Sequence, residues 1–543
     1  MLSSRRVMKG FSTFSEPACG SSEGEHPISK EEVAMKRLVR FAKVWITPLV
    51  LVAILGSCAP ATPPSPTAIP PTPTIGKVTP AAPAPSPTAA PAAVTLRVLS
   101  LPWPQTPVEQ ELANKEFTPK TGIKVEISGP PYQFVESKIR ELCASQSAEY
   151  DIYEIDSQWY GAMITSDCVE PLDAYLKASG INYDETFVQP YATYNGRWPI
   201  PVAVLRGEED WRKYTDMPVY FLPWTIGTMI LGYRADLFKE AGIVDANGNP
   251  KAPETWDEFL AAAKKLTVDV NGDGKIDRYG VGWYAGRISD GITQQWLNFH
   301  GSFGARLWDE KTWTAQGIIN SPQAVAACEF FTSFNLKEHV VDPGTANWFV
   351  DELLNGAFTD KYAMNFTWVS FAGAMDNPQI SQTAGKWAYA PMPCYVDPAT
   401  GKKRCAATYG SQGIAINKHS KNKEAAWKYL EWLISRDTQK KLIDDPRAGF
   451  ASARQDLFDY QIQTPGTARW ASLKSITGGW GFDVWTIPEY GQLLDIQQNY
   501  LNLAYIGAIP CKQALDQIAL LQQRILDTSP FNPKNGGKII FGR

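Results

Sequence analysis

Aromatic and hydrogen-bonding side chains follow two predicted strands near the start of the foldable part of the sequence. A strand over 95–100 leads into Trp103 and Gln105, and a strand over 150–156 ends in Asp156-Ser157-Gln158-Trp159. Open α/β sheets bind ligands beyond the carboxyl ends of their strands. Aromatic rings can stack on the apolar faces of sugar rings, while carboxylate and amide groups bond hydroxyls. Both loops therefore predict a site for a polar solute.

Further candidate side chains come from later segments. The run Tyr409-Gly410-Ser411-Gln412-Gly413 predicts a glycine-rich turn whose backbone can approach a ligand closely. Gln412 would join Asp156 and Gln158 in bonding hydroxyls, and Tyr409 would offer a ring. Trp224 ends an extended run between two prolines, and Trp296 lies on a helix predicted over 293–299.

Composition favours binding over catalysis. The 543 residues include 19 tryptophans and 22 tyrosines, more than a core needs, and 52 basic residues against 56 acidic ones give no case for nucleic-acid binding. The four histidines lack metal-binding spacing, and no Gly-x-Ser-x-Gly or phosphate-loop motif occurs. A carboxylate pair of the glycosidase kind depends on a separation in space. A secreted carbohydrate-active hydrolase therefore stays open as an alternative.

Strands and helices alternate along the chain, which predicts an α/β fold. The first lobe is expected to hold a mostly parallel sheet. After the extended run 217–224, the pattern predicts a strand over 228–233 and a helix over 236–241 that Gly242 closes. Thr255 and Glu258 form a capping box for a helix that extends to Leu266.

Two of these segments resemble a known family. Residues 233–243, Tyr-Arg-Ala-Asp-Leu-Phe-Lys-Glu-Ala-Gly-Ile, and residues 253–259, Pro-Glu-Thr-Trp-Asp-Glu-Phe, resemble the signature of extracellular solute-binding proteins of family 1, the maltose-binding-like receptors of ABC importers. The resemblance implies a two-lobed periplasmic-binding-protein-like fold of type II. Each lobe would be a mostly parallel sheet flanked by helices, and hinge crossings near 218–224 and 391–393 would join the lobes.

The same resemblance implies function and further site residues. A tryptophan at the place of Trp368, which ends a strand predicted over 361–368, stacks on the sugar in that family, and lobe-two contacts are expected around Trp485 and Tyr490. The chain would be a monomeric receptor, not an enzyme, that delivers a carbohydrate or related solute to permease subunits. No cofactor is required. A sugar-sensing or adhesion module without transport is a further alternative.

The resemblance and the composition together divide the chain. Lobe 1 is predicted over 94–217 and 391–445, and lobe 2 over 218–390 and 446–543, the last part being the C-terminal helices. Residues 58–93 are a Pro/Thr-rich segment with the composition of a semi-rigid spacer or of a glycosylated stalk.

The N-terminal residues predict export. Residues 35–57 have a basic start, an apolar run and a small-residue end, which is the order of a signal peptide, and Leu-Gly-Ser-Cys at 55–58 resembles the lipobox of bacterial lipoproteins. Cys58 would be lipidated and would anchor the protein at the cell surface or in the periplasm. Residues 1–34 are interpreted as an upstream mis-start. A transmembrane anchor is the alternative, although the apolar run is short.

An acidic loop and the cysteines complete the candidates. Oxygen side chains occur in the loop 269–280 with the spacing of the first part of an EF-hand, but Gly280 stands where a bidentate glutamate is needed. Both a calcium site and a tight Asx-rich turn fit this loop. The calcium ligands would be Asp269, Asn271, Asp273 and Asp277.

Six cysteines follow Cys58, and in an exported chain they predict disulfides, with 15 pairings open. Cys394 and Cys405 flank a predicted hairpin and are expected to pair. Cys143 and Cys168 each follow a helix around one strand, so a bond between them is also expected. Cys328 with Cys511 is the remaining pair.

Overall fold

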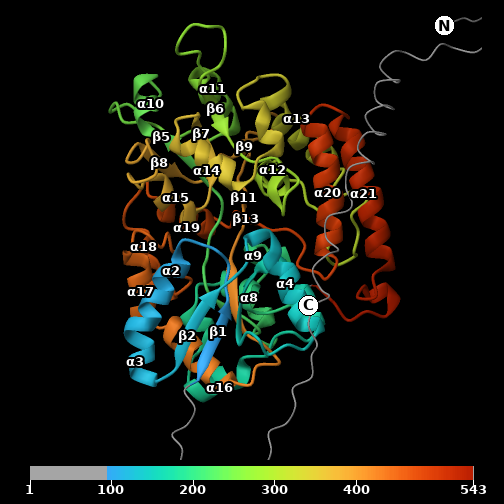
Figure 1. Cartoon of the computed structure of the whole chain (residues 1–543). Helices are drawn as coiled ribbons and strands as arrows, with labels where there is room; N and C mark the ends of the chain where they lie inside the picture. Colours follow the sequence, from blue (N-terminus) through green and yellow to red (C-terminus); the bar gives the residue numbers. More distant parts are fainter. Residues whose placement is uncertain (1–93, 542–543) are drawn as a thin grey trace, which may run out of the picture. The chain divides into compact units, whose positions relative to one another are not determined.

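The larger of the two main sheets contains five strands. The computed structural model describes residues 94–541, and the strands of this sheet lie in the order β2-β1-β3-β12-β4. Its strands β1 and β2 are labelled in the lower part of Figure 1. Strand β1 pairs parallel with β2 and β3, whereas β12 pairs antiparallel with β3 and β4. The bounds are β1 Thr95–Leu99, β2 Lys124–Ser128, β3 Ile152–Asp156, β4 Leu222–Pro223 and β12 Gln412–Ile416.

The second sheet has four strands in the order β6-β7-β5-β8 and lies in the upper part of Figure 1. Strands β6 and β7 are parallel, and β5 pairs antiparallel with both β7 and β8. The bounds are β5 Ile230–Arg234, β6 Tyr279–Gly282, β7 Tyr362–Thr367 and β8 Trp387–Ala390. Each main sheet and its helices form one α/β body, the first body around β2-β1-β3-β12-β4 and the second body around β6-β7-β5-β8. These two bodies confirm the predicted fold class.

Both sheets are mixed rather than mostly parallel, because the chain passes between them. Strand β12 begins where β3 ends, with Gln412 opposite Asp156, and β5 begins where β7 ends, with Ile230 opposite Thr367. A chain that arrives from the other sheet enters at the strand ends that face that sheet. Because β3 and β7 have their carboxyl ends there, the entering strand runs antiparallel to them.

The second passage comes later in the chain than the predicted crossing at 391–393. Cys394 still exchanges backbone hydrogen bonds with Glu254 and Trp256 of the second body, and the chain first joins the first sheet at Gln412. The prolines at 391 and 393 lead instead into the hairpin of β9 (Tyr395–Val396) and β10 (Lys403–Arg404). Next comes β11 (Ala407–Thr408), which pairs with β13 (Gly481–Phe482).

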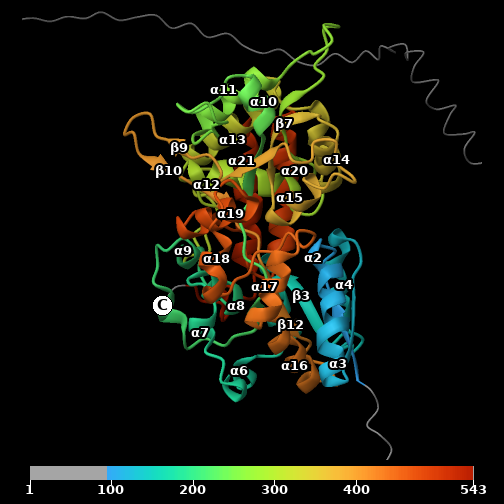
Figure 2. The same cartoon turned by 90° about the vertical axis from the view of Figure 1, so that its left-hand side faces the viewer.

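Helices cover both sheets (Figures 1 and 2). With the first sheet lie α2 Gln105–Leu112, α3 Thr118–Thr121, α4 Val135–Ala144, α5 Tyr160–Thr165, α6 Asp173–Ser179, α7 Tyr183–Thr186, α8 Tyr191–Gly196, α9 Val202–Leu205, α16 Lys423–Leu433, α17 Arg436–Asp444 and α18 Phe458–Gln461. With the second lie α10 Ala235–Glu240, α11 Trp256–Leu266, α12 Gly291–Ser302, α13 Pro322–Leu336, α14 Val350–Phe358, α15 Val369–Met375, α19 Ala468–Thr477, α20 Tyr490–Tyr505 and α21 Cys511–Thr528.

Local signals set the helix starts. The capping box predicted at Thr255 is present, since the backbone N–H of Glu258 donates to Thr255 Oγ1 at 3.2 Å and the Glu258 carboxylate accepts from the backbone of Thr255 at 3.3 Å. The helix α11 that follows buries Phe259 and Ala263. Such a cap satisfies backbone donors that would otherwise lack partners.

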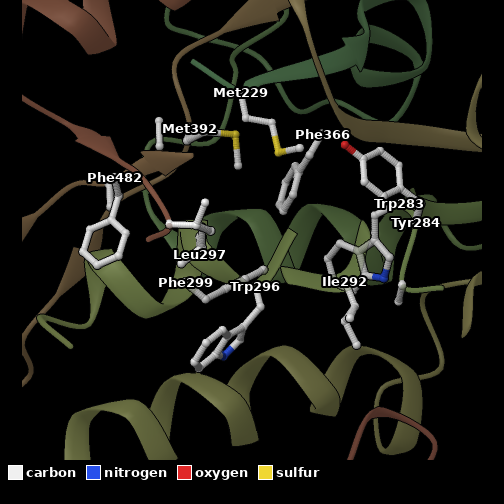
Figure 3. Close-up of a cluster of buried hydrophobic side chains, with 14 of the residues drawn as sticks. Met229, Trp283, Tyr284, Ile292, Trp296, Leu297, Phe299, Phe366, Met392 and Phe482 are labelled. Atoms are coloured by element: carbon white, nitrogen blue, oxygen red, sulfur yellow. The ribbon is translucent and has the colours of Figure 1, made fainter. Parts of the chain in front are cut away.

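Many of the aromatic residues are buried in the core of the second body (Figure 3). Trp256 stacks on Phe299 with ring centroids 4.1 Å apart, and Trp283 lies 5.6 Å from Phe366. Six tryptophans are among the largest fully buried side chains: Trp224, Trp256, Trp283, Trp296, Trp313 and Trp485. The high aromatic count is therefore in large part a packing feature, and it points to sugar binding less directly than the composition suggested.

Several predictions for the N-terminal part fall outside the described residues. These are the mis-start over 1–34, the signal peptide over 35–57, the lipidation of Cys58 and the spacer over 58–93. Among residues 94–541, no helix combines the length and apolar composition that a membrane crossing requires.

Three disulfides join the pairs expected from the sequence. Cys143 bonds Cys168 in the first body, while Cys328 bonds Cys511 and Cys394 bonds Cys405 in the second. The Cys328–Cys511 bond connects α13 to α21 across 183 residues, whereas only 11 residues separate Cys394 from Cys405. A longer closed loop restricts the unfolded chain more strongly.

Removal of the long-range disulfide should therefore destabilise the protein most. The double variant Cys328→Ala/Cys511→Ala is expected to lose about 5 kcal/mol of unfolding free energy, against about 3 kcal/mol for Cys394→Ala/Cys405→Ala. Denaturant unfolding under non-reducing conditions measures both losses. A smaller loss for the Cys328/Cys511 variant would contradict the assignment of α21 as an element tied to the core through this bond.

Candidate ligand-binding site

A pocket of about 100 Å³ lies where the strand ends of the two sheets face each other. Its lining comes from the loops after β1, β3 and β7, from the start of α12, and from the segments that pass between the sheets. The chain therefore closes this pocket with residues from distant parts of its sequence, as the strand-end rule predicts.

The carboxylate of Asp156 at the end of β3 is the centre of the first-sheet side. It accepts hydrogen bonds from Tyr132 Oη at 2.6 Å, Gln412 Nε2 at 2.7 Å and Gln158 Nε2 at 3.4 Å. Burial raises the pKa of Asp156 to about 6, although these donors oppose the shift. Gln412 lies opposite Asp156 in the sheet, so the strand pairing itself sets this contact.

A chain of hydrogen bonds forms the second-sheet side. Trp368 Nε1 donates to Tyr284 Oη at 3.1 Å, and Tyr284 Oη donates to Gln294 Oε1 at 2.7 Å. Gln294 Nε2 in turn donates to Asp290 Oδ2 at 2.6 Å. Burial raises the pKa of Asp290 to about 7, and the nearby Asp156 adds to the rise. The edge of the Trp368 ring and the start of α12 are thus connected.

A third aspartate comes from the segment after β13. Asp483 Oδ2 accepts from Ser157 Oγ at 3.0 Å and from Tyr194 Oη at 3.1 Å. Burial raises its pKa to about 7. Tyr194 lies on α8, so this helix supports Asp483 without lining the pocket itself.

Rings from both bodies meet at the pocket. Trp103 lies 5.0 Å from Tyr132 and 5.8 Å from Phe371, which follows β7, measured between ring centroids. Trp368 lies against the backbone of Gly410, where an added Cβ would come within 2.7 Å of its ring. Glycine is therefore required at position 410 for the ring to occupy this place.

Seven of the twelve candidate binding residues from the sequence line the pocket: Trp103, Gln105, Asp156, Gln158, Trp368, Tyr409 and Gln412. The other five, Trp159, Trp224, Trp296, Trp485 and Tyr490, do not line it and are buried.

Packing contacts explain the positions of three of these residues. The ring centroids of Trp159 and Tyr132 lie 5.8 Å apart, and those of Trp224 and Phe450 lie 4.8 Å apart. In Figure 3, Trp296 points from α12 away from Met229 and Met392, and its ring lies 4.1 Å from that of His300. Large apolar rings beside a pocket can equally complete the core around it.

Several residues that line the pocket were not predicted from the sequence. Tyr132, Tyr284, Asp290, Gln294 and Asp483 all line the pocket. Asp290 directly precedes α12 and Asp483 follows β13 within an aromatic run, so a search for acids at element ends would have found both.

The acidic loop after α11 has the hydrogen bonds of Asx turns. Asp269 accepts from the backbone of Gly272 and Gly274 at 2.7 and 2.8 Å, and Asp277 accepts from Val270 and Asn271 at 2.7 and 3.1 Å. In the part of the chain that the structure describes, no group of three or more His, Cys, Asp or Glu side chains is placed to hold a metal ion. Calcium binding by Asp269, Asn271, Asp273 and Asp277 stays a prediction.

Solved structures share this fold. A maltose-bound T. maritima MalE3 superposes with a TM-score of 0.64 and 22% identity, covering 80% of this chain and 100% of that chain. A solute-binding protein of Agrobacterium vitis with bound D-mannitol gives 0.62 and 24%, covering 80% of this chain and 99% of that chain. At these identities the likeness establishes the fold.

Sequence comparison gives the same family. The erythritol/L-threitol-binding protein of Mycolicibacterium smegmatis is 22% identical over 378 residues, which are 67% of this chain and 71% of that protein. The family model for bacterial extracellular solute-binding proteins matches residues 103–440, well over half of the sequence. The chain belongs to the family of bacterial extracellular solute-binding proteins.

Proposed function

We propose that the chain is the receptor of an ABC importer and binds a carbohydrate or related polar solute, such as a polyol, in the pocket between its two sheets. The observation that carries this proposal is the joint lining of one pocket by rings and hydrogen-bonding groups from both bodies. Members of this family are solute-binding receptors and not enzymes. The similar proteins named above are described with maltose, D-mannitol and erythritol or L-threitol.

The proposed roles follow from the side chains. Trp103 and Trp368 stack on the solute from opposite bodies, while Asp156, Gln158 and Gln412 bond its hydroxyls. A solute that lacks a hydroxyl leaves one of these buried groups unpaired, at a cost of about 1–3 kcal/mol. Trp159, Trp224, Trp296, Trp485 and Tyr490 would support these groups by packing.

The two bodies act as lobes that close on the solute by hinge bending. Segments near 224–229 and 408–412 connect the sheets beside the pocket, so a change in the lobe angle would change the pocket directly. The closed, solute-bound monomer is the form presented to the permease subunits, because solute binding shifts the population toward it. The division into lobes predicted from the sequence is part of this proposal, with the second crossing near 408–412 in place of 391–393.

Export and anchoring complete the proposal. The protein carries a lipid on Cys58, and the segment 58–93 acts as the spacer between the membrane and the folded part.

Solute binding is tested by thermal unfolding against hexoses, disaccharides and polyols, followed by calorimetry for each solute that raises the melting temperature. At least one should raise it, because a ligand that binds only the folded state stabilises it by mass action. The absence of any shift at millimolar concentrations would count against the proposed solute class.

Replacement of the proposed stacking ring should weaken that binding. Trp368→Ala is expected to bind the identified solute on the order of tenfold to a hundredfold more weakly, because a buried aromatic anchor is lost. The matched control is Trp211→Ala, since Trp211 is a partly buried tryptophan outside the pocket. Equal affinities of the two variants in calorimetry would refute a role for Trp368 in stacking.

Lipidation is tested separately in bacterial cells that express the full chain. Radiolabelled palmitate should enter the wild-type protein and be absent from Cys58→Ala, which lacks the proposed acceptor. Label that persists in the variant, or is missing from the wild type, would exclude Cys58 as the anchor without affecting the proposed binding site.

A further inference from the structure

The pocket brings three carboxyl groups together without a basic side chain beside them. Asp156, Asp290 and Asp483 all line it, and none of the described residues that line it is a lysine, arginine or histidine. Each aspartate is at most 5% exposed. Buried carboxylates are costly unless an opposite charge or enough donors accompany them.

Protein donors satisfy the three aspartates unequally. Asp156 accepts from three side chains, and Asp483 accepts through both of its oxygens. Asp290 accepts only through Oδ2, and its buried Oδ1 has no hydrogen-bond partner among the described residues. Among the carboxylate oxygens of the three aspartates, Asp290 Oδ1 alone is therefore left for a donor that the solute brings.

The surroundings suit an organic cation. Trp103, Tyr132, Tyr284 and Trp368 present rings at the same pocket, and aromatic faces attract cations. Metal binding is disfavoured by the spacing of the acids, because the described residues contain no group of three or more acidic, His or Cys side chains placed to hold an ion.

We infer that the solute is an amine-bearing sugar or polyol whose ammonium group lies among Asp156, Asp290 and Asp483 and donates to Asp290 Oδ1. The inference rests on the proposed function and narrows its solute class. A neutral solute could donate a hydroxyl to the same oxygen, but it would leave the three acids without an opposite charge. An ammonium group supplies both the donor and the charge.

The pH dependence follows from the groups around the three acids. The pKa values, about 6 for Asp156 and about 7 for Asp290 and Asp483, mean that these groups lose protons between pH 5 and 8. The phenols that face them have raised pKa values and stay neutral there: Tyr132, Tyr160, Tyr194, Tyr284, Tyr409 and Tyr490. The carboxylate of Glu136 also faces Asp156 and forms an ion pair with Arg140. An ammonium group should thus bind more tightly as pH rises and should release protons on binding.

Matched pairs of solutes test the inference in calorimetry at pH 7.5. N-methyl-D-glucamine is compared with D-glucitol, D-glucosamine with D-glucose and D-galactosamine with D-galactose, and any other neutral solute that binds is compared with its amino counterpart. In at least one pair, the amine is expected to bind more tightly than its neutral partner by a factor of about ten or greater. For N-methyl-D-glucamine, whose alkylamine stays protonated over this range, the preference should fall about tenfold by pH 5. Titration in two buffers of different ionisation enthalpy should show proton release near pH 6.5.

Asp290→Asn should reduce the preference for the amine about tenfold. The control is Glu109→Gln, because Glu109 is an equally buried acid that Tyr429 bonds at 2.7 Å outside the pocket. If the neutral partner binds as tightly as the amine in every pair that binds, the inference is overturned while the proposed receptor function stands. If no sugar, polyol or amine binds, both fail. The pH and proton-release measurements on the wild type decide the question even where Asp290→Asn does not fold.

Discussion

The pocket depends on one constraint, which is the burial of the Asp156 carboxylate at the end of β3. Its three donors come from separate segments: Tyr132 precedes α4, Gln158 follows β3, and Gln412 begins β12. A buried charge needs such partners, so this one group fixes the relative positions of all three segments. Because Gln412 is also where the chain re-enters the first sheet, the same bond ties the site to the passage between the sheets.

The mixed sheets and the site have a common origin. Strands β12 and β5 both start at the edges where β3 and β7 end, so the chain must pass the pocket whenever it changes sheets. The end of β3 supplies Asp156, the loop after β7 supplies Trp368, and the segments that pass between the sheets supply Thr225 and Gly410. A movement of one sheet against the other therefore alters the ring walls and the polar groups together. Binding and closure use the same residues.

Sequence signals predicted the fold better than the site. The capping box at Thr255, the strand before Trp368 and the α/β class are local or periodic features, and the structure confirms them. The passage at 391–393 was misplaced because a proline pair indicates only extended backbone, and here it leads into a hairpin. Trp103 was identified from a strand end and Trp368 from the family resemblance, but Trp224 and Trp485 fill the core. Ring type alone does not separate these two roles.

The acids of the pocket show why the other site residues could not be predicted from the sequence. Asp290 and Asp483 are two of 56 acidic residues in a chain of net charge −4, and no sequence spacing relates them to Asp156. Their significance lies in what surrounds them after folding, since burial raises their pKa values and no basic side chain lines the pocket beside them in the described residues. Net charge describes the whole surface, whereas selectivity for a solute depends on the few charges that water cannot reach. A nearly neutral protein can therefore enclose a site that is rich in carboxyl groups.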